Sequence, residues 1–323
     1  PISLLFEPVS ESSLQIFEKS RHEDLPAFKS QNEAVKWYLK GLNESGLCLM
    51  DNLKRHPNPL TQLRLFNFFC IFHLVRYMAL LEAYYGGENI RPVLLDFSGI
   101  APSQSSVARA SEMAYTQMHK SINRFYAWGY AQKLKEKDYS KEDLLQSETP
   151  VYDEKKKASV EFSTLWNLAK ERASACATDD AARLVFGETM YDMLALEASS
   201  HPVNCLKILG TSAGMLYPPD QMHPNKRFVL SQDILEMILR STVSPDEVLS
   251  GNDMRNRLWE RFGIIIGGST YEIEKLQSSG MLLQIDEDSL ERNFTSFAAL
   301  LESMDFAEVM ADGILQIRLG GSD

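Results

Sequence analysis

Hydrophobic residues are densest between positions 60 and 85, in the run LTQLRLFNFFCIFHLVRYMALLEAYY. On a helical wheel with about 100° per residue, its polar residues form two narrow lines that separate two broad apolar faces. These lines are Gln62, His73 and Arg76 on one side, and Arg64, Asn67 and Glu82 on the other. Such a helix typically packs between neighbours, so we predict a buried central helix. We expect His73 and Arg76 to be a satisfied polar pair inside the core.

A second long helix is predicted from about Ser105 to Lys135, a stretch without proline. Its apolar face contains Val107, Ala110, Ala114, Met118, Phe125 and Trp128. Its outer face carries a basic stripe, which we define as Arg109, Lys120, Arg124 and Lys135. Surface helices commonly carry such charges on a solvated face. The alternative is a docking face for an acidic partner or a phosphate backbone.

Apolar spacing, caps and turn residues predict the other N-terminal and middle elements. Ser13 caps a short helix, further helices cover 32–42 and 51–54, and the prolines of HPNP (56–59) make a turn. The highly charged residues 136–158 indicate a linker or exposed loop. Two helices follow, at VEFSTLWNLAKERASACA and after Thr178, before an irregular region over 204–228.

The C-terminal quarter combines helices with a hairpin. Helices are predicted after Ser231, at DEVLS behind the cap Ser244-Pro245, from Asn252, from Thr270 to Gly280, and in the run that begins at Asp286. GIIIGG (263–268) is predicted to be a short strand or extended turn. Asp312-Gly313 between two apolar runs predicts a β-hairpin. Helices followed by a hairpin are the order of a winged-helix domain, which we predict over about 230–320.

The predicted fold class is mainly α, with multi-helical N-terminal and middle regions and a C-terminal winged-helix-like α/β domain. The predicted organisation has four parts. These are a helical domain around the central helix (1–138), a charged linker or loop (139–158), a helical region with an irregular loop (159–229), and the winged-helix-like domain (230–323).

Composition favours a soluble, cytoplasmic protein. With 323 residues and 44% hydrophobic content, the chain is long enough for two or three domains with cores of their own. Its four cysteines, Cys48, Cys70, Cys176 and Cys205, have neither CxxC nor Cys/His metal spacing, so we expect reduced, buried thiols. The N-terminal residues lack the basic start and apolar block of a signal peptide. Charges within residues 60–85 argue against a membrane helix, which needs about 20 nearly uncharged residues.

The net charge of −11 argues against general adhesion to nucleic acid or anionic lipid. Between Asp286 and Asp312 there are eight acidic residues and one basic residue, Arg292. The predicted helix before the hairpin is therefore a poor reader of a DNA groove, and protein contact is the favoured role of this domain. Three arginines on an earlier helix offer alternative phosphate contacts, unless they pair with Glu260 and its neighbours. These are Arg255, Arg257 and Arg261.

GTSAG (210–214) matches G-x-S-x-G, the nucleophile elbow of serine hydrolases, and makes Ser212 a weak catalytic candidate. An elbow needs a helix immediately after the motif, but here Pro218-Pro219 follows closely. The last histidine, His223, is too near in sequence for the usual triad. The motif resembles that of patatin-like lipases, which use a Ser–Asp dyad, and this resemblance implies Asp312 as the acid. The glycine-rich oxyanion segment of those enzymes is missing.

These observations leave three hypotheses. The first is a non-enzymatic interaction or scaffold subunit of an intracellular multiprotein assembly, bound to other protein subunits. By analogy with other winged helices, this would be a bacterial DNA-processing or antiviral defence complex. The second is a subunit that binds DNA or RNA through the basic stripe, and the third is a hydrolase that uses Ser212. No GxxxxGK[ST], GxGxxG or HExxH motif occurs, so no cofactor or metal is predicted.

Overall fold

A computed structural model describes residues 33–80, 91–99, 101, 103–150, 160–197, 202–221, 223–280, 285–311 and 313–319. The predicted helix after Ser13 lies outside these ranges. The described chain is mainly helical, as predicted. Its helices are α2 (Glu33–Arg55), α3 (Pro59–Ala79), α4 (Ser106–Glu136), α5 (Lys141–Gln146), α6 (Val160–Ser174), α7 (Asp179–Glu197), α8 (Pro202–Ser212), α9 (Gln232–Thr242), α10 (Gly251–Phe262), α11 (Thr270–Ser278) and α12 (Glu287–Ser303).

The strands are short and form three small sheets. They are β1 (Val93–Leu94), β2 (Leu216–Tyr217), β3 (Arg227–Phe228), β4 (Val248–Ser250), β5 (Ile264–Ile265), β6 (Ala307–Val309) and β7 (Leu315–Arg318). β1 pairs in parallel with β5, and β2 pairs antiparallel with β3. In the third sheet the order is β4-β7-β6, with both pairs antiparallel. The predicted C-terminal hairpin is therefore present as β6–β7, although Asp312 itself lies outside the described residues.

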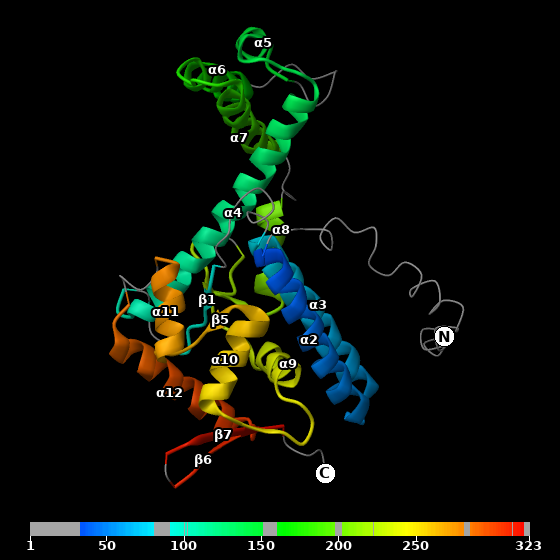
Figure 1. The fold of residues 1–323 in the computed structure, drawn as a ribbon, viewed down its shortest axis with the longest axis vertical. Coiled ribbons are helices and arrows are strands. Elements are labelled where there is room, and N and C mark those ends of the chain that lie inside the picture. The colour runs from blue at the N-terminus through cyan, green and yellow to red at the C-terminus, as the bar shows by residue number, and fades with distance from the viewer. Residues whose placement is uncertain are drawn as a thin grey trace, which may run out of the picture.

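An antiparallel helical hairpin, α2 and α3, lies along one side of the molecule (Figure 1). The HPNP turn ends one helix and begins the next, as predicted: the Asn58 side chain accepts a hydrogen bond from the N–H of Leu60 at 2.9 Å, and Pro59 takes the first helical position. The segments predicted over 32–42 and 51–54 belong to one continuous helix, α2.

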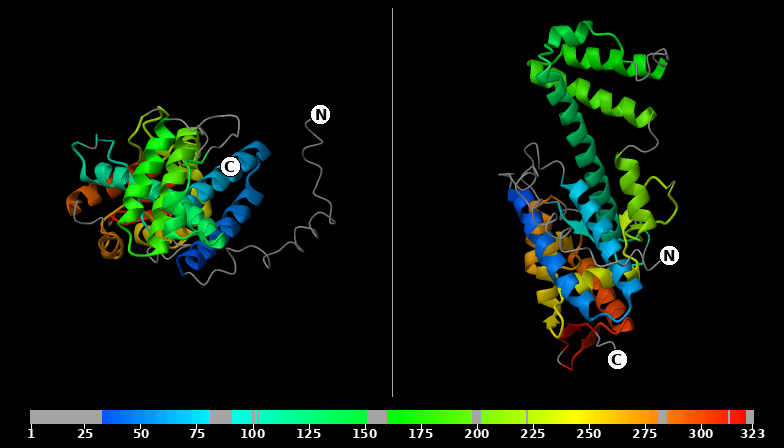
Figure 2. Two further views of the ribbon diagram at one scale, coloured as in Figure 1. Left: turned by 90° about the horizontal axis from the view of Figure 1, so that it is seen from above. Right: turned by 90° about the vertical axis from the view of Figure 1, so that its right-hand side faces the viewer.

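The predicted second long helix is confirmed as α4, which Ser105 caps. At 31 residues it is about 46 Å long. Its C-terminal half extends beyond the rest of the fold, and α5, α6 and α7 lie beside it (Figures 1 and 2). We call this part the arm and the remainder the body.

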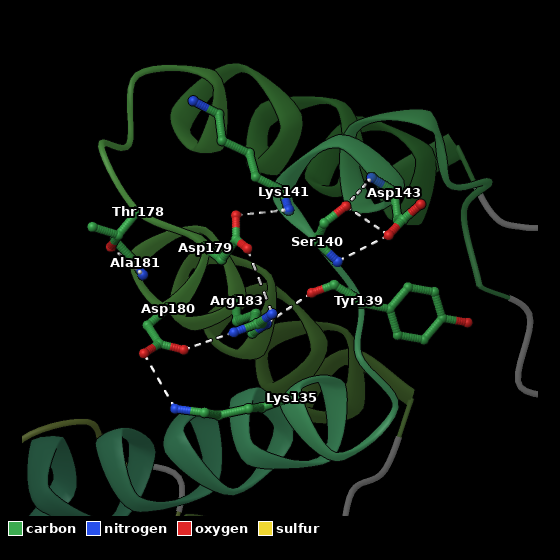
Figure 3. A network of polar contacts seen from close by, with 10 residues as sticks. All are labelled: Lys135, Tyr139, Ser140, Lys141, Asp143, Thr178, Asp179, Asp180, Ala181 and Arg183. Carbon is green, nitrogen blue, oxygen red and sulfur yellow. Dashed lines mark hydrogen bonds and ion pairs between the residues drawn. The ribbon is translucent and has the colours of Figure 1, made fainter.

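The arm has its own small core and a polar network at its tip. Trp166, Phe186 and Met193 are buried in that core. At the tip, Lys135 of α4 contacts Asp180 of α7 at 3.2 Å, and the same carboxylate accepts a hydrogen bond from Arg183 (Figure 3). A close backbone approach joins the two helices lower down, because a Cβ at Gly187 would lie 2.1 Å from the carbonyl oxygen of Ala127.

Two predictions about the middle of the chain are wrong in part. The charged segment predicted as a linker or loop contains α5, which begins with a capping box between Ser140 and Asp143. Residues 151–159 lie outside the described ranges. The region predicted to be irregular over 204–228 begins inside α8, because Pro202 occupies the first helical position, where its missing N–H costs nothing.

The C-terminal quarter also differs in one element. DEVLS was expected to be helical, but Asp246 has a positive φ of 65° and residues 248–250 form β4. Their backbone pairs with β7 across the chain, which a local cap pattern does not reveal. The helix predicted from Asn252 begins one residue earlier, at Gly251, and Ser250 caps it. GIIIGG contains a short strand, as predicted.

One hydrophobic cluster extends from the α2–α3 hairpin through α4 to α12 and β7. It includes Leu49, Leu65, Val75, Ile122, Ile238, Leu258, Phe297 and Ile317. The regions predicted as the first and last domains therefore share a core in the body, and the domain boundaries themselves stay predictions.

A buried asparagine on α12 ties together three segments of this core. The Asn293 side-chain nitrogen donates to the carbonyls of Leu95 at 2.8 Å and Ile266 at 2.7 Å. Its oxygen accepts from the N–H of Phe97 at 2.7 Å. Since these three backbone groups flank β1 and β5, Asn293 fixes α12 against that parallel pair.

A second buried asparagine fixes the N-terminal hairpin. The Asn52 side chain on α2 donates to the carbonyls of Arg240 at 2.7 Å and Val243 at 2.9 Å, at the end of α9. These carbonyls have no partner within their own helix, so the contact satisfies them while it orients α2 on the body.

Candidate interaction surface

Apolar side chains are exposed along the whole outer side of α3. We define the α3 stripe as Leu60, Leu63, Phe66, Cys70, Leu74 and Tyr77. Leu60 is 70% exposed, Leu63 47% and Leu74 46%. Their spacing of three or four residues places them on one helix face. The prediction that α3 is buried on both apolar faces is wrong, and so is the prediction that all cysteines are buried, since Cys70 is exposed.

The opposite face of α3 explains how the helix is held. Leu65, Phe72 and Val75 are buried in the main cluster. Phe72 also makes an edge-to-face contact with Phe262 of α10, with ring centroids 5.5 Å apart. One apolar face of α3 thus anchors the helix to the body, while the other is left on the surface.

A shallow groove runs beside the stripe. Its volume is about 330 Å³, and its walls come from Leu60, Leu63, Arg64, Asn67, Phe68 and Ile71. These positions follow the i, i+3, i+4 pattern over three helical turns. In helix packing, a groove between such rows receives a ridge of side chains from another helix.

Charges border the stripe but do not interrupt it. From Pro59 to Ala79 the charged residues are Arg64 and Arg76, and Arg76 is buried. Arg64 lies at the edge, where it contacts Asp233 at 3.2 Å and Glu236 at 3.7 Å on α9. On the paired helix α2, Leu47 and Met50 are also exposed and follow Gly46, which packs against the ring of Phe69.

His73 lies inside the hairpin, away from any open cleft. It is 5% exposed, and its Nδ1 and Nε2 atoms lie 3.2 Å from the Tyr38 hydroxyl and 3.4 Å from the Ser45 hydroxyl. Burial, together with the charge of Arg76, lowers the pKa of His73 to about 3. The imidazole is therefore neutral at neutral pH and serves the packing of α2 on α3.

Arg76 is the other half of this buried pair, and it is less well satisfied than predicted. Burial lowers the pKa of its guanidinium to about 10. Among the residues that the structure describes, its Nε and Nη2 atoms have no hydrogen-bond partner. The guanidinium packs on Gly263, where a Cβ would come within 2.6 Å of Nη2, so the glycine leaves room for it.

The basic stripe follows α4 from the body to the arm. Arg109, Lys120 and Arg124 are exposed, as is Lys135 at the tip. The first and last positions are 26 residues apart, or about 39 Å along the helix. Lys135 contacts Asp180 (Figure 3), so its charge is partly compensated within the arm. A role of this stripe in nucleic-acid binding stays a prediction.

Two of the three C-terminal arginines hold the end of α9. Arg257 contacts both carboxylate oxygens of Glu247, at 2.5 and 2.8 Å. This contact lowers the pKa of Glu247 to about 2. Arg261 donates to the carbonyls of Ser241 at 2.7 Å and Thr242 at 2.9 Å. Both guanidinium groups therefore satisfy groups of this chain.

The third arginine, Arg255, is also drawn inward. Its guanidinium lies 4.1 Å from the centre of the Phe294 ring and 3.7 Å from the buried carboxylate of Glu272. It also donates to the side chain of Asn252. The three arginines thus pair within the chain, with Glu247, Glu272, the Asn252 side chain and backbone carbonyls, where the sequence suggested Glu260 and its neighbours.

Ser212 does not occupy a nucleophile elbow. It is exposed at the last position of α8, whereas the elbow places the serine between a strand and a following helix. Its hydroxyl accepts from the side chain of Gln221 at 3.4 Å. The Nδ1 atom of His223 lies 2.7 Å from the carbonyl oxygen of Asn225. Asp312, the acid that the motif implied, lies outside the described residues.

The described ranges contain no group of three or more His, Cys, Asp or Glu residues arranged to hold a metal ion. None of the described helices is long and apolar enough to cross a membrane. The chain matches no protein-family model, and no curated protein or solved structure is significantly similar to it.

Proposed function

We propose that this protein is a non-enzymatic interaction subunit, and that the α3 stripe binds an amphipathic helix of another protein chain. The observation that carries this proposal is the uncharged row of exposed apolar side chains over the length of α3. Contiguous exposed apolar surface of this kind marks interaction sites in proteins. The groove beside it offers the packing geometry for a second helix.

The charge of the protein specifies the partner further. Two copies that each carry a net charge of −11 repel one another, which disfavours pairing of two α3 stripes. Asp233 and Glu236 of α9 contact Arg64, which borders the stripe, so acidic side chains lie close to its edge. A partner helix with an uncharged apolar face and basic residues along its border complements both features.

The area of the stripe limits how tightly it binds alone. Its six side chains are about half exposed, and full burial of one large apolar side chain stabilises by about 1.5–3 kcal/mol. Their complete burial is therefore worth about 5–9 kcal/mol. Association costs about 4–15 kcal/mol in lost freedom. The stripe alone thus supports a weak complex, and a stable assembly needs a second contact.

We infer that the second contact is made by a winged-helix-like module over 230–320. The order α9, β4, α10, then α12, β6 and β7, with the sheet order β4-β7-β6, supports this inference, while β5 and α11 are additions to the usual plan. The exposed side of α12 carries Glu287, Glu291 and Glu302. An acidic face repels phosphates, so the inferred role is contact with protein.

Affinity enrichment with matched variants tests the proposal. The tagged wild-type chain, Leu63→Glu and Leu196→Glu are used on extracts of the source organism. Leu196 is 58% exposed on α7, so the control places the same charge on an exposed leucine of another helix. We expect one protein to be retained by wild type and Leu196→Glu and lost with Leu63→Glu. Its amphipathic segment, made as a peptide, should show the same order of affinities.

Three results would overturn the proposal. The first is that no retained protein is sensitive to Leu63→Glu. The second is a peptide that binds Leu63→Glu as well as wild type. The third is that the captured chain is a second copy of this protein.

A further inference from the structure

The arm contains a cavity that the proposed function does not use. Its volume is about 540 Å³, and residues of α4, α5, α6 and α7 form its walls. Trp166 and Leu144 are buried at this site, and Tyr130, Leu134 and Met190 complete the apolar lining. Small-molecule sites in proteins typically have volumes of about 300–1,000 Å³ and mostly apolar walls.

Trp166 gives the cavity a rigid aromatic wall. The side chain is 4% exposed and stands edge-to-face against Phe186, with ring centroids 4.8 Å apart, so the indole is held in place. Its Nε1–H group has no acceptor in the part of the chain that the structure describes. The nitrogen is also closed to solvent, so it does not face the open cavity, and the indole contributes its ring rather than its N–H group to the wall.

The charges at the cavity set the charge of the ligand. Lys133 and Lys137 line it together with Glu136 and Glu148, and all four are exposed. The opposite charges balance one another at the rim. The interior contributes apolar surface, which selects an uncharged molecule.

We propose that the arm cavity binds a small, uncharged, mainly apolar molecule that packs against the Trp166 side chain. The apolar body of the ligand fills the space between Leu134, Leu144 and Met190. This site is distinct from the α3 stripe, so it extends the proposed function rather than depending on it.

Fluorescence titration of the full-length chain with Nile red tests the site. Nile red is uncharged and mainly apolar, and it fluoresces strongly in apolar surroundings. Ser147→Phe places a ring at the cavity wall and should weaken binding about tenfold or more. Ser174→Phe is the matched control, because both hydroxyls donate to the carbonyl three residues earlier, at 2.6 and 2.7 Å, but Ser174 is outside the cavity.

The indole N–H signals identify where the dye binds. The chain has four tryptophans, and Trp166→Phe assigns the Nε1–H resonance of interest in a ¹H–¹⁵N spectrum. We expect saturable binding that shifts this resonance and leaves those of Trp37 and Trp259 in place, and that persists in Leu63→Glu. Binding that is unchanged in Ser147→Phe, a Trp166 signal that does not move at saturation, or the absence of saturable binding would overturn the proposal.

Discussion

Acidification should destabilise the protein through His73, and replacing this histidine should remove that part of the pH dependence. In the folded protein the pKa of this histidine is about 3, because it is buried beside Arg76. In the unfolded chain a histidine has its ordinary value of about 6.5. Below pH 6.5 the unfolded state therefore binds the proton and the folded state does not, so stability falls as the pH falls.

The two pKa values fix the size of the effect. Between pH 7 and pH 5 the unfolded histidine becomes almost fully protonated, while the folded one stays neutral. Each pH unit well below 6.5 costs about 1.4 kcal/mol of unfolding free energy, so acidification to pH 5 costs about 2 kcal/mol. This contribution is complete above pH 6.5 and disappears progressively as the pH falls toward 3.

Urea unfolding at pH 7 and pH 5 measures the effect. On going from pH 7 to pH 5, the unfolding free energy of His73→Gln should fall by about 2 kcal/mol less than that of wild type. This difference does not depend on how stable the variant is at pH 7. The control is Asn293→Ala, which destabilises the same core without removing a titrating group and should keep the wild-type pH dependence. If His73→Gln loses as much stability on acidification as wild type, the imidazole is not buried and neutral.

Three further predictions concern the packing of the arm and the body. Gly187→Ala should destabilise the protein by about 1–3 kcal/mol in thermal or urea unfolding, because the added Cβ meets a backbone carbonyl of α4. Gly129→Ala should stabilise the protein by about 0.5–1 kcal/mol, because nothing lies within 4 Å of the added Cβ. Asn293→Ala should lower the unfolding free energy by about 3 kcal/mol or more, since it leaves two buried carbonyls and one partly buried N–H unpaired; a loss below 1 kcal/mol would contradict its role. The pKa of Glu247 is lowered to about 2 from an ordinary 4.5, so its contact with Arg257 contributes stability above pH 4.5 that is lost as the pH falls through 2. Glu247→Gln should accordingly show a smaller loss over that range in urea unfolding.

Local signals in the sequence identified most helices of the body. The HPNP turn, the cap at Ser105 and the absence of proline up to Lys135 depend on neighbours in the chain, and the structure has α3 and α4 as predicted. The Asp-Gly hairpin signal depends on two residues and is also correct in its strands. Features of this kind can be predicted because the physical cause lies within a few residues.

The elements that sequence reasoning missed depend on contacts between distant segments. β4 forms because Val248 and Leu249 pair with β7, far along the chain, and no cap pattern contains that information. The exposure of one face of α3 could not be predicted for the same reason. Its two apolar faces look equivalent in the sequence, and only the position of the body decides which of them is covered. The signal that could have revealed the stripe was the presence of a second apolar face on a helix that needs only one to fold.

The arginines illustrate the same point for candidate binding residues. Arg255, Arg257 and Arg261 resembled a phosphate-binding set because their carboxylate and carbonyl partners are ten to twenty residues away and are not on their own helix face. The structure brings Glu247 to Arg257 through the turn before β4. It leaves Arg109, Lys120 and Arg124 exposed, and only a binding assay across salt concentrations can assign them a role.

Photo-cross-linking from position 66 tests the central claim most directly. A benzophenone amino acid replaces Phe66, which is 43% exposed within the α3 stripe, or Leu168, which is 49% exposed on α6 of the arm. After irradiation in extracts of the source organism, we expect position 66 alone to give a cross-linked product. Its partner peptide should have apolar residues spaced by three and four with basic residues at the border. Equal cross-linking from both positions, or a product that contains only a second copy of this chain, would contradict the account.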